Sequence, residues 1–220
     1  MQQPIRILIA DDHPIFRHGL ISILRNEPEF TVVGEAADGR QALKMIQDVH
    51  PDVLLLDQVM PELTGLETLR ELSNSPSPVR TILLTAGITK EQIAQALQLG
   101  ARGIVLKDAP TEVLFNSIRS VMTGQFWVGQ NNVADLMQAL RAYVPAADDQ
   151  SKKQFGLTAR ESDVVGSIVA GLTNREIAEN FSISEQTVKH HLRNIFDKLG
   201  VSNRLELALF AINHGLVSRD

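Results

Sequence analysis

Five polar residues in the first half of the chain follow short apolar runs: Asp11, Asp12, Asp57, Thr85 and Lys107. Three carboxylates held together repel one another unless a hard cation lies among them, and Mg2+ prefers oxygen ligands from carboxylates, phosphate and water. With such a metal offsetting the charge, one carboxylate can attack phosphorus and form an acyl phosphate. The lysine would then neutralise the added charge, and the threonine would donate a hydrogen bond to a phosphoryl oxygen. These residue types therefore predict phosphoryl transfer at a Mg2+ site.

The elements that must position these side chains are strands and helices in alternation. Five short apolar runs without polar alternation are typical of strands that helices cover on both faces. Segments with apolar residues three and four apart lie between them. The runs span 5–10, 31–36, 53–56, 81–84 and 103–106, and the clearest helical segments span 15–24, 41–49 and 93–99. The pattern predicts a five-stranded, doubly wound parallel sheet over residues 1–125.

The predicted sheet explains why the five polar residues would meet. In open parallel sheets the functional crevice lies beyond the carboxyl ends of the strands, and these residues follow four such ends. Asp57 is the expected nucleophile, because the run 53–56 before it is the most apolar and hence the most central. A single Asp at a strand end is more often a cap or a turn former, so the prediction depends on the agreement of four strand ends.

The last part of the chain, residues 155–220, has no plausible strand. Helical periodicity predicts four helices near 158–170, 174–181, 184–199 and 203–213. Two capping boxes support the first two of these helices, Thr158 with Glu161 and Thr173 with Glu176. We therefore expect an all-α domain of four short helices. The stretch 126–154 is interpreted as a linker with a possible helix over 131–143, because 145–153 is small, polar and charged.

The predicted helix over 184–199 combines a buried stripe with an exposed basic face. Its apolar residues lie three and four apart, and they are Val188, Leu192, Ile195, Phe196 and Leu199. Joined by a short turn to a capped helix, it has the plan of a helix-turn-helix. Lys189 and Arg193 share a face and are expected to enter a DNA groove, with His190 beside them. Thr173, Asn174 and Thr187, at helix N-termini, are expected to anchor DNA phosphates. The alternative is that two cations simply solvate an exposed face.

Composition limits the classes of protein that fit. The formal net charge is -5, with 11 Lys and Arg against 15 Asp and Glu over 1–125 and 7 against 8 over 155–220. Any DNA-binding surface must therefore be local. The lack of cysteine excludes disulfides, cysteine-based zinc sites and thiol catalysis. A secretory signal and an apolar run of about 20 residues are both missing, so we expect a cytoplasmic protein without a membrane segment.

The first domain resembles the receiver domain of two-component response regulators. The resemblance is carried by ILIADDH at 7–13, LLLDQVMP at 54–61, LTA at 84–86 and LKDAP at 106–110. It implies a flavodoxin-like fold in which Asp57 accepts a phosphoryl group from a histidine kinase. It also implies that Asp11 or Asp12, Asp57 and the backbone carbonyl of Val59 bind Mg2+, and that Thr85 and Lys107 read the phosphorylated state.

The second domain, over 157–216, is similar to the LuxR-type helix-turn-helix, and the two together resemble the NarL/FixJ family of response regulators. This resemblance implies transcription regulation by sequence-specific binding to double-stranded DNA, as a homodimer formed through the last helix, 203–214. Two positions depart from the usual receiver pattern. Ile104 stands where many receivers have an aromatic switch residue, and the side chain of Val59 cannot orient an attacking water, so slow loss of the phosphoryl group is expected.

Three other functions fit parts of the sequence. A phosphotransferase or phosphatase would use the same Asp nucleophile and Mg2+, but the sequence offers no second general acid or base. Catalysis is therefore expected to be limited to self-phosphorylation and slow hydrolysis. A regulator that binds DNA independently of phosphorylation is the second alternative. An interaction module whose C-terminal helices bind protein is the third, and salt-dependent binding to duplex DNA would separate it from the favoured function.

Overall fold

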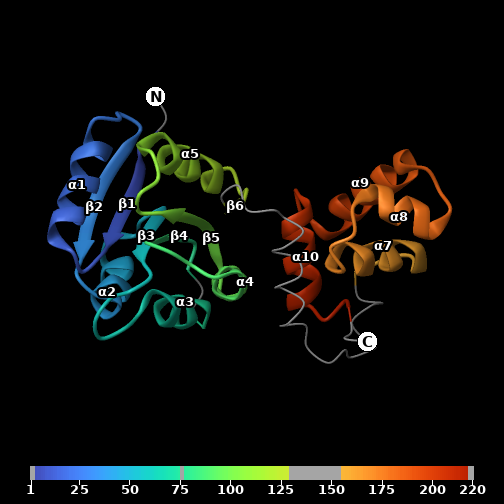
Figure 1. The fold of residues 1–220 in the computed structure, drawn as a ribbon. Coiled ribbons are helices and arrows are strands. Elements are labelled where there is room, and N and C mark those ends of the chain that lie inside the picture. The colour runs from blue at the N-terminus through green and yellow to red at the C-terminus, as the bar shows by residue number, and fades with distance from the viewer. Residues whose placement is uncertain (1–2, 75–76, 129–154, 218–220) are drawn as a thin grey trace. The chain divides into compact units, whose positions relative to one another are not determined.

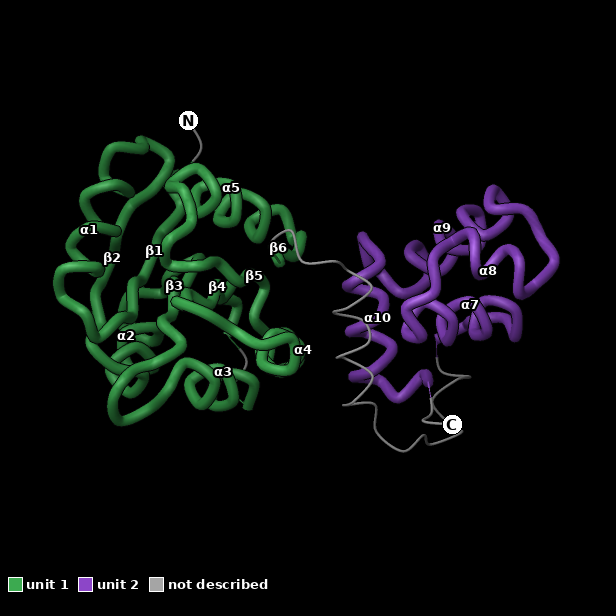
Figure 2. Tube along the Cα trace, viewed as in Figure 1, with its two compact units in different colours: residues 1–129 green, residues 130–220 purple. Residues whose placement is uncertain are grey.

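The chain divides into two compact units, residues 1–129 and 130–220 (Figure 2). A computed structural model describes residues 3–74, 77–128 and 155–217. The helix predicted over 131–143 and all but residues 126–128 of the linker predicted over 126–154 lie outside the described residues. Among the described residues, no helix is both long enough and apolar enough to span a bilayer.

The first unit is built on a parallel sheet with the strand order β2-β1-β3-β4-β5-β6 (Figure 1). In that order the strands are Phe30–Ala36, Ile5–Ala10, Val53–Asp57, Arg80–Thr85, Ala101–Leu106 and Trp127–Val128. The predicted doubly wound sheet is confirmed, but it has six strands where five were expected. The additional β6 pairs with β5 through Gly103 with Trp127 and Ile104 with Val128. Two residues are too few to show a hydrophobic period, which is why the sequence did not predict β6.

Helices cover both faces of this sheet, so its central strands are buried on both sides (Figure 1). Apolar side chains of β1, β3 and β4 pack with those of α1 and α5 in one core cluster. The other three helices, α2, α3 and α4, cover the opposite face. In chain order the helices are Pro14–Arg25, Gly39–Val49, Gly65–Ser73, Lys90–Gln98 and Thr111–Met122. All five residues of β3 are buried, as its uninterrupted apolar run predicted.

The loop after β3 is held closely against that strand. The backbone N–H of Gly65 donates to the carbonyl oxygen of Gln58 at 3.0 Å. A Cβ at position 65 would collide with the carbonyl oxygen of Asp57, so only glycine permits this approach. Helix α3 then begins at once, capped by Thr64 in a capping box with Glu67. The loop between Asp57 and α3 is therefore held at both ends, by β3 before it and by the capped start of α3 after it.

Over its described residues, 155–217, the second unit has four helices, as expected. They are α7 (Ala159–Val169), α8 (Asn174–Phe181), α9 (Glu185–Leu199) and α10 (Arg204–Asn213). The capping boxes of Thr158 with Glu161 and of Thr173 with Glu176 are both formed. Four residues of the predicted α9 stripe are buried, and Phe196 is half-buried.

Glu161 and Lys198 join α7 to α9. The Nζ atom of Lys198 donates to Glu161 Oε2 at 2.7 Å, and the same oxygen accepts from the N–H and the hydroxyl of Thr158. The side chain of Glu161 is 5% exposed and that of Lys198 is 37% exposed. Burial alone would raise the pKa of Glu161, but the hydrogen bonds from Lys198 and Thr158 outweigh it and lower the pKa below its usual value. The carboxylate therefore stays ionised in the helical unit.

We expect replacement of Lys198 by methionine to destabilise the helical unit by about 1–3 kcal/mol at pH 7. Breaking a buried ion pair costs more than this, but the partial exposure of Lys198 lets water compensate in part. Because the pKa of Glu161 is lowered on folding, its contribution is complete above the unfolded value of about 4.3 and is lost as the pH falls through the lower folded pKa. The difference from the parent chain should shrink accordingly in acid.

The measurement is denaturant unfolding followed by circular dichroism, because the single tryptophan, Trp127, lies in the first unit. Lys189→Met, the same change at an exposed position of α9, is the matched control and should cost little. Equal stability of the two variants would contradict a role for the Glu161–Lys198 pair.

Candidate functional site

The carboxyl ends of β1, β3 and β5 bring three predicted residues together. Asp11, which follows β1, is fully buried, and Asp57, the last residue of β3, is 2% exposed. Lys107 follows β5, and its Nζ lies 2.7 Å from Asp11 Oδ2 and 2.8 Å from Asp57 Oδ2. One ammonium therefore bridges two buried carboxylates, which leaves a net negative pocket at this edge of the sheet.

Local contacts hold this arrangement in place. The N–H of His13 donates to Asp11 Oδ1 at 2.8 Å, and Arg17 Nη1 donates to the Asp11 carbonyl at 2.6 Å. The ring of Phe16 lies 4.7 Å from Lys107 Nζ, a cation–π contact that orients the ammonium. Helix α1, which begins at Pro14, two residues after Asp12, supplies both Phe16 and Arg17.

The electrostatics of the pocket favour an added positive charge. Burial is the main cause that raises the pKa of Asp57, and the nearby Asp11 raises it further, against the opposing effects of Lys107 and the N–H of Val59. Burial alone would lower the pKa of Lys107, but its hydrogen bonds with Asp11 and Asp57 outweigh this and raise it. Lys107 therefore stays charged. Its single positive charge faces the carboxyl groups of Asp11, Asp12 and Asp57, so a further cation is favoured.

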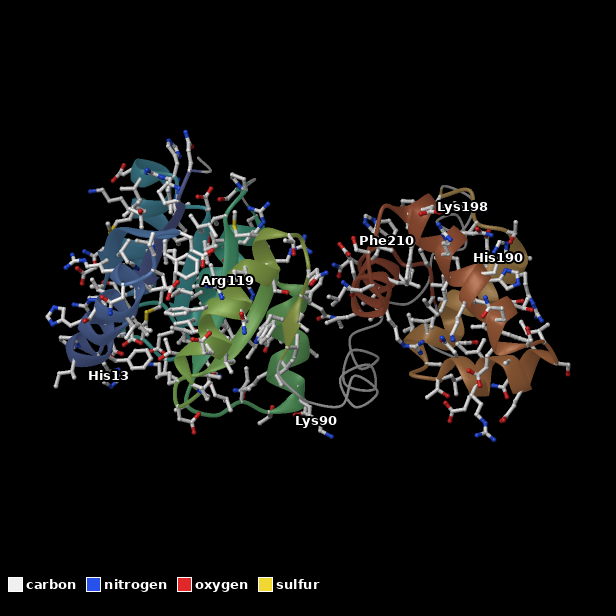
Figure 3. All side chains as sticks on the ribbon, turned by 90° about the horizontal axis from the view of Figure 1, so that it is seen from above. His13, Lys90, Arg119, His190, Lys198 and Phe210 are labelled. Carbon is white, nitrogen blue, oxygen red and sulfur yellow. The ribbon has the colours of Figure 1, made fainter. Side chains whose placement is uncertain are left out.

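The donor atoms of this pocket fit a divalent metal. Asp11, Asp12, His13 and Asp57 each offer a ligand atom, and these atoms lie within 4.8 Å of one another. Carboxylate oxygens dominate the set, which suits a hard cation such as Mg2+. Asp12 is half-buried, and its Oδ1 lies 2.7 Å from His13 Nδ1. His13, labelled in Figure 3, was not among the predicted ligands, although its position next to the acidic pair was a signal.

Val59 and Thr85 lie beside the pocket in different ways. The N–H of Val59 donates to Asp57 Oδ1 at 3.4 Å, and its side chain is exposed. Thr85, the last residue of β4, is 2% exposed. Its hydroxyl donates to Gln58 Oε1 or to the carbonyl of Gly87 at 2.8 Å, and it accepts from the N–H of Gly87 at 3.1 Å. Gln58 is a site residue that sequence reasoning missed.

The predicted DNA contacts all lie on α8, α9 and their N-termini. Lys189, His190 and Arg193 are exposed on α9, and His190 is labelled in Figure 3. Thr187 is half-buried, and its hydroxyl lies 2.8 Å from Ser184 Oγ, the N-cap of α9. The helix thus presents three exposed basic or polar side chains along one turn, with its apolar stripe turned inward.

Thr173 and Asn174 already make hydrogen bonds within the unit. Thr173 caps α8 and donates its hydroxyl to Glu176 Oε2 at 2.8 Å. Asn174 Oδ1 accepts from Arg204 Nη1 at 3.3 Å, and Arg204 also donates to the Leu172 carbonyl. Arg204 was not predicted, and it joins the start of α10 to the start of α8. These bonds fix the N-terminus of α8 relative to the start of α10.

Comparison with known proteins assigns both units to families. Residues 7–119 match the response regulator receiver domain, and residues 156–211 match the bacterial regulatory proteins of the luxR family. The chain belongs to the response regulators. It carries a receiver domain followed by a LuxR-type DNA-binding domain and is homologous to transcriptional regulators of two-component systems.

Similar proteins match this response regulator over nearly its whole length. The transcriptional regulatory protein YhcZ of Bacillus subtilis is 36% identical, with 96% of this chain and 97% of YhcZ covered. The nitrate/nitrite response regulator protein NarL of Escherichia coli is 34% identical, with 95% of each chain covered. The structure of two RcsB dimers bound to two parallel DNAs is similar with a TM-score of 0.55 and 25% identity, covering 94% of this chain and 98% of that one. The predicted class of transcription regulator, rather than a classical enzyme, is thus confirmed.

Proposed function

We propose that this response regulator accepts a phosphoryl group on Asp57 from a histidine kinase, and that the phosphorylated form binds its operator more tightly. The observation that carries the proposal is the bridge from Lys107 Nζ to the buried carboxylates of Asp57 and Asp11. A buried carboxylate beside a fixed cation is suited to nucleophilic attack on phosphorus.

The chemistry follows from the residues of the pocket. An oxygen of Asp57 forms a bond to phosphorus while the phosphorus–nitrogen bond of the kinase phosphohistidine breaks, and the bond electrons leave with the imidazole. Lys107 keeps its proton and holds its positive charge against the new phosphoryl oxygens. Asp11, Asp12 and Asp57, with the carbonyl of Val59, would hold Mg2+, which when bound offsets the charge of the carboxylates and the phosphate. Thr85 would donate its hydroxyl to a phosphoryl oxygen.

The same proposal places α9 in the major groove of duplex DNA. Lys189 and Arg193 are the expected base or phosphate contacts, with His190 beside them. The N-termini of α8 and α9, with Thr173, Asn174 and Thr187, would lie against the phosphate backbone. Two copies of the chain would bind two half-sites as a homodimer through α10. The likeness to DNA-bound RcsB dimers supports the dimer, although not the helix that forms it.

Operator affinity with and without phosphorylation tests this proposal. An operator is first selected from random duplexes with the full chain, and its affinity is then measured after treatment with acetyl phosphate and Mg2+. We expect phosphorylation to raise the affinity by about 5- to 150-fold, the usual range for coupled sites, and Asp57→Asn to show no increase. Sedimentation of the same samples reports dimer formation.

A phosphorylated parent chain with unchanged affinity and unchanged sedimentation would contradict this proposal. DNA binding independent of phosphorylation would then be the better account. Intact mass measured on the same samples shows that the parent was phosphorylated, so the outcome cannot reflect failed labelling. The affinity for duplex DNA should also fall as the salt concentration rises, because phosphate contacts release counterions. An affinity that does not change with salt would argue against DNA as the partner.

A further inference from the structure

Gln58, the residue directly after Asp57, is buried and fixed by its backbone. It is 9% exposed. Its N–H donates to the carbonyl of Leu84 at 2.9 Å, and its own carbonyl accepts from Gly65 at 3.0 Å. These two bonds anchor it between β4 and the start of α3. The side chain of Gln58 therefore stays in this buried environment. A buried amide needs a hydrogen-bond partner there.

That partner is the hydroxyl of Thr85, which donates to Gln58 Oε1. Gly87 lies on the other side of the same hydroxyl, with its carbonyl at 2.8 Å and its N–H at 3.1 Å. A hydroxyl has one proton. The proton can be donated to Gln58, to Gly87 or to a phosphoryl oxygen on Asp57, but to only one of them at a time. Gln58 and a phosphorylated Asp57 therefore compete for it.

We propose that Gln58 is a positioning residue that holds the Thr85 hydroxyl in the unphosphorylated state and so opposes the switch to the phosphorylated state. When Thr85 turns to a phosphoryl oxygen, the buried amide oxygen of Gln58 loses its donor, and this loss has a cost. The amide thus sets how strongly a phosphoryl group must bind to move Thr85. The inference rests on the proposed function, because it concerns the threshold of the same site.

The test is the affinity of the full chain for beryllofluoride, a phosphoryl analogue, in the presence of Mg2+, measured by fluorine NMR. Gln58→Met keeps a similar side-chain length but replaces the amide by a thioether, which is a weak acceptor. We expect it to bind beryllofluoride about three- to tenfold more tightly than the parent, the range of one neutral hydrogen bond that no longer has to be broken. Gln58→Leu should act in the same direction.

A double-mutant cycle with Thr85→Val separates positioning from a merely structural role. Valine has no hydroxyl, so Gln58→Met in the Thr85→Val background should leave the affinity unchanged. A structural effect on the loop would change the affinity equally in both backgrounds. Thermal unfolding shows whether each variant is folded. If Gln58→Met does not fold, Gln58→Leu takes its place in the cycle.

The outcomes distinguish this inference from the proposed function. If the parent chain does not bind beryllofluoride, the proposed function fails and this inference fails with it. If the parent binds and Asp57→Asn does not, the proposed site stands. In that case, unchanged or weaker binding by the Gln58 variants overturns the role of Gln58 alone, and so does equal tightening with and without the Thr85 hydroxyl.

Discussion

Replacement of Asp57 by asparagine is expected to reduce phosphorylation of the chain by acetyl phosphate to an undetectable level. The amide has nearly the shape of the carboxylate but lacks the anionic oxygen that attacks phosphorus. Asp57 lies at the end of the fully buried β3, with Lys107 Nζ at 2.8 Å, so its carboxylate is held in place beside a fixed cation. Intact mass after incubation with acetyl phosphate and Mg2+ measures the result.

The matched control for this variant is Asp38→Asn. Asp38 caps α2 through its side chain, and asparagine caps a helix about as well as aspartate, so phosphorylation should be unaffected. Chelation of Mg2+ before the reaction should abolish labelling of the parent, because the carboxylates around Asp57 would then repel the incoming phosphate. Labelling of Asp57→Asn at the parental level would transfer the acceptor role to another side chain, with Asp11 and Asp12 the first to examine.

Removal of the two basic side chains on α9 is the second change for which we expect a large effect. Lys189→Ala and Arg193→Ala should each cost about 1–3 kcal/mol of operator binding if the side chain contacts a base, and together they should reduce the affinity by at least about 30-fold. A base contact is recognised by relaxed specificity at one position. A phosphate contact instead weakens all sequences alike and lowers the salt slope by about one.

Arg40→Ala is the matched control for charge. Arg40 lies in the receiver domain, and its side chain is 73% exposed, with Glu62 at 3.9 Å. The variant removes the same charge without touching the helical unit, so operator affinity should stay near that of the parent. Parental affinity in the Lys189 and Arg193 variants would show that another face of the helical unit reads DNA.

The sequence alone was sufficient to predict the local elements of this response regulator. Strand β1 was predicted with the bounds Ile5–Ala10, and the helices α7 to α10 were predicted to within a few residues. Hydrophobic period and capping boxes are properties of neighbouring residues, so they can be read along the chain. The rule that functional residues follow parallel strands also predicted that Asp11, Asp57 and Lys107 would meet.

Only the tertiary structure decided which side chains pair across the fold. Thr85 was expected to face a phosphoryl group, but its hydroxyl donates to Gln58, 27 residues earlier, or to the carbonyl of Gly87. The pair of Lys198 with Glu161 spans 37 residues, and Arg204 reaches Asn174 across 30. The short strand β6 forms by pairing with the edge of β5. Such contacts depend on strand register and helix packing, which fix the distances between residues that are remote in sequence. Local hydrophobic periodicity carries no information about those distances.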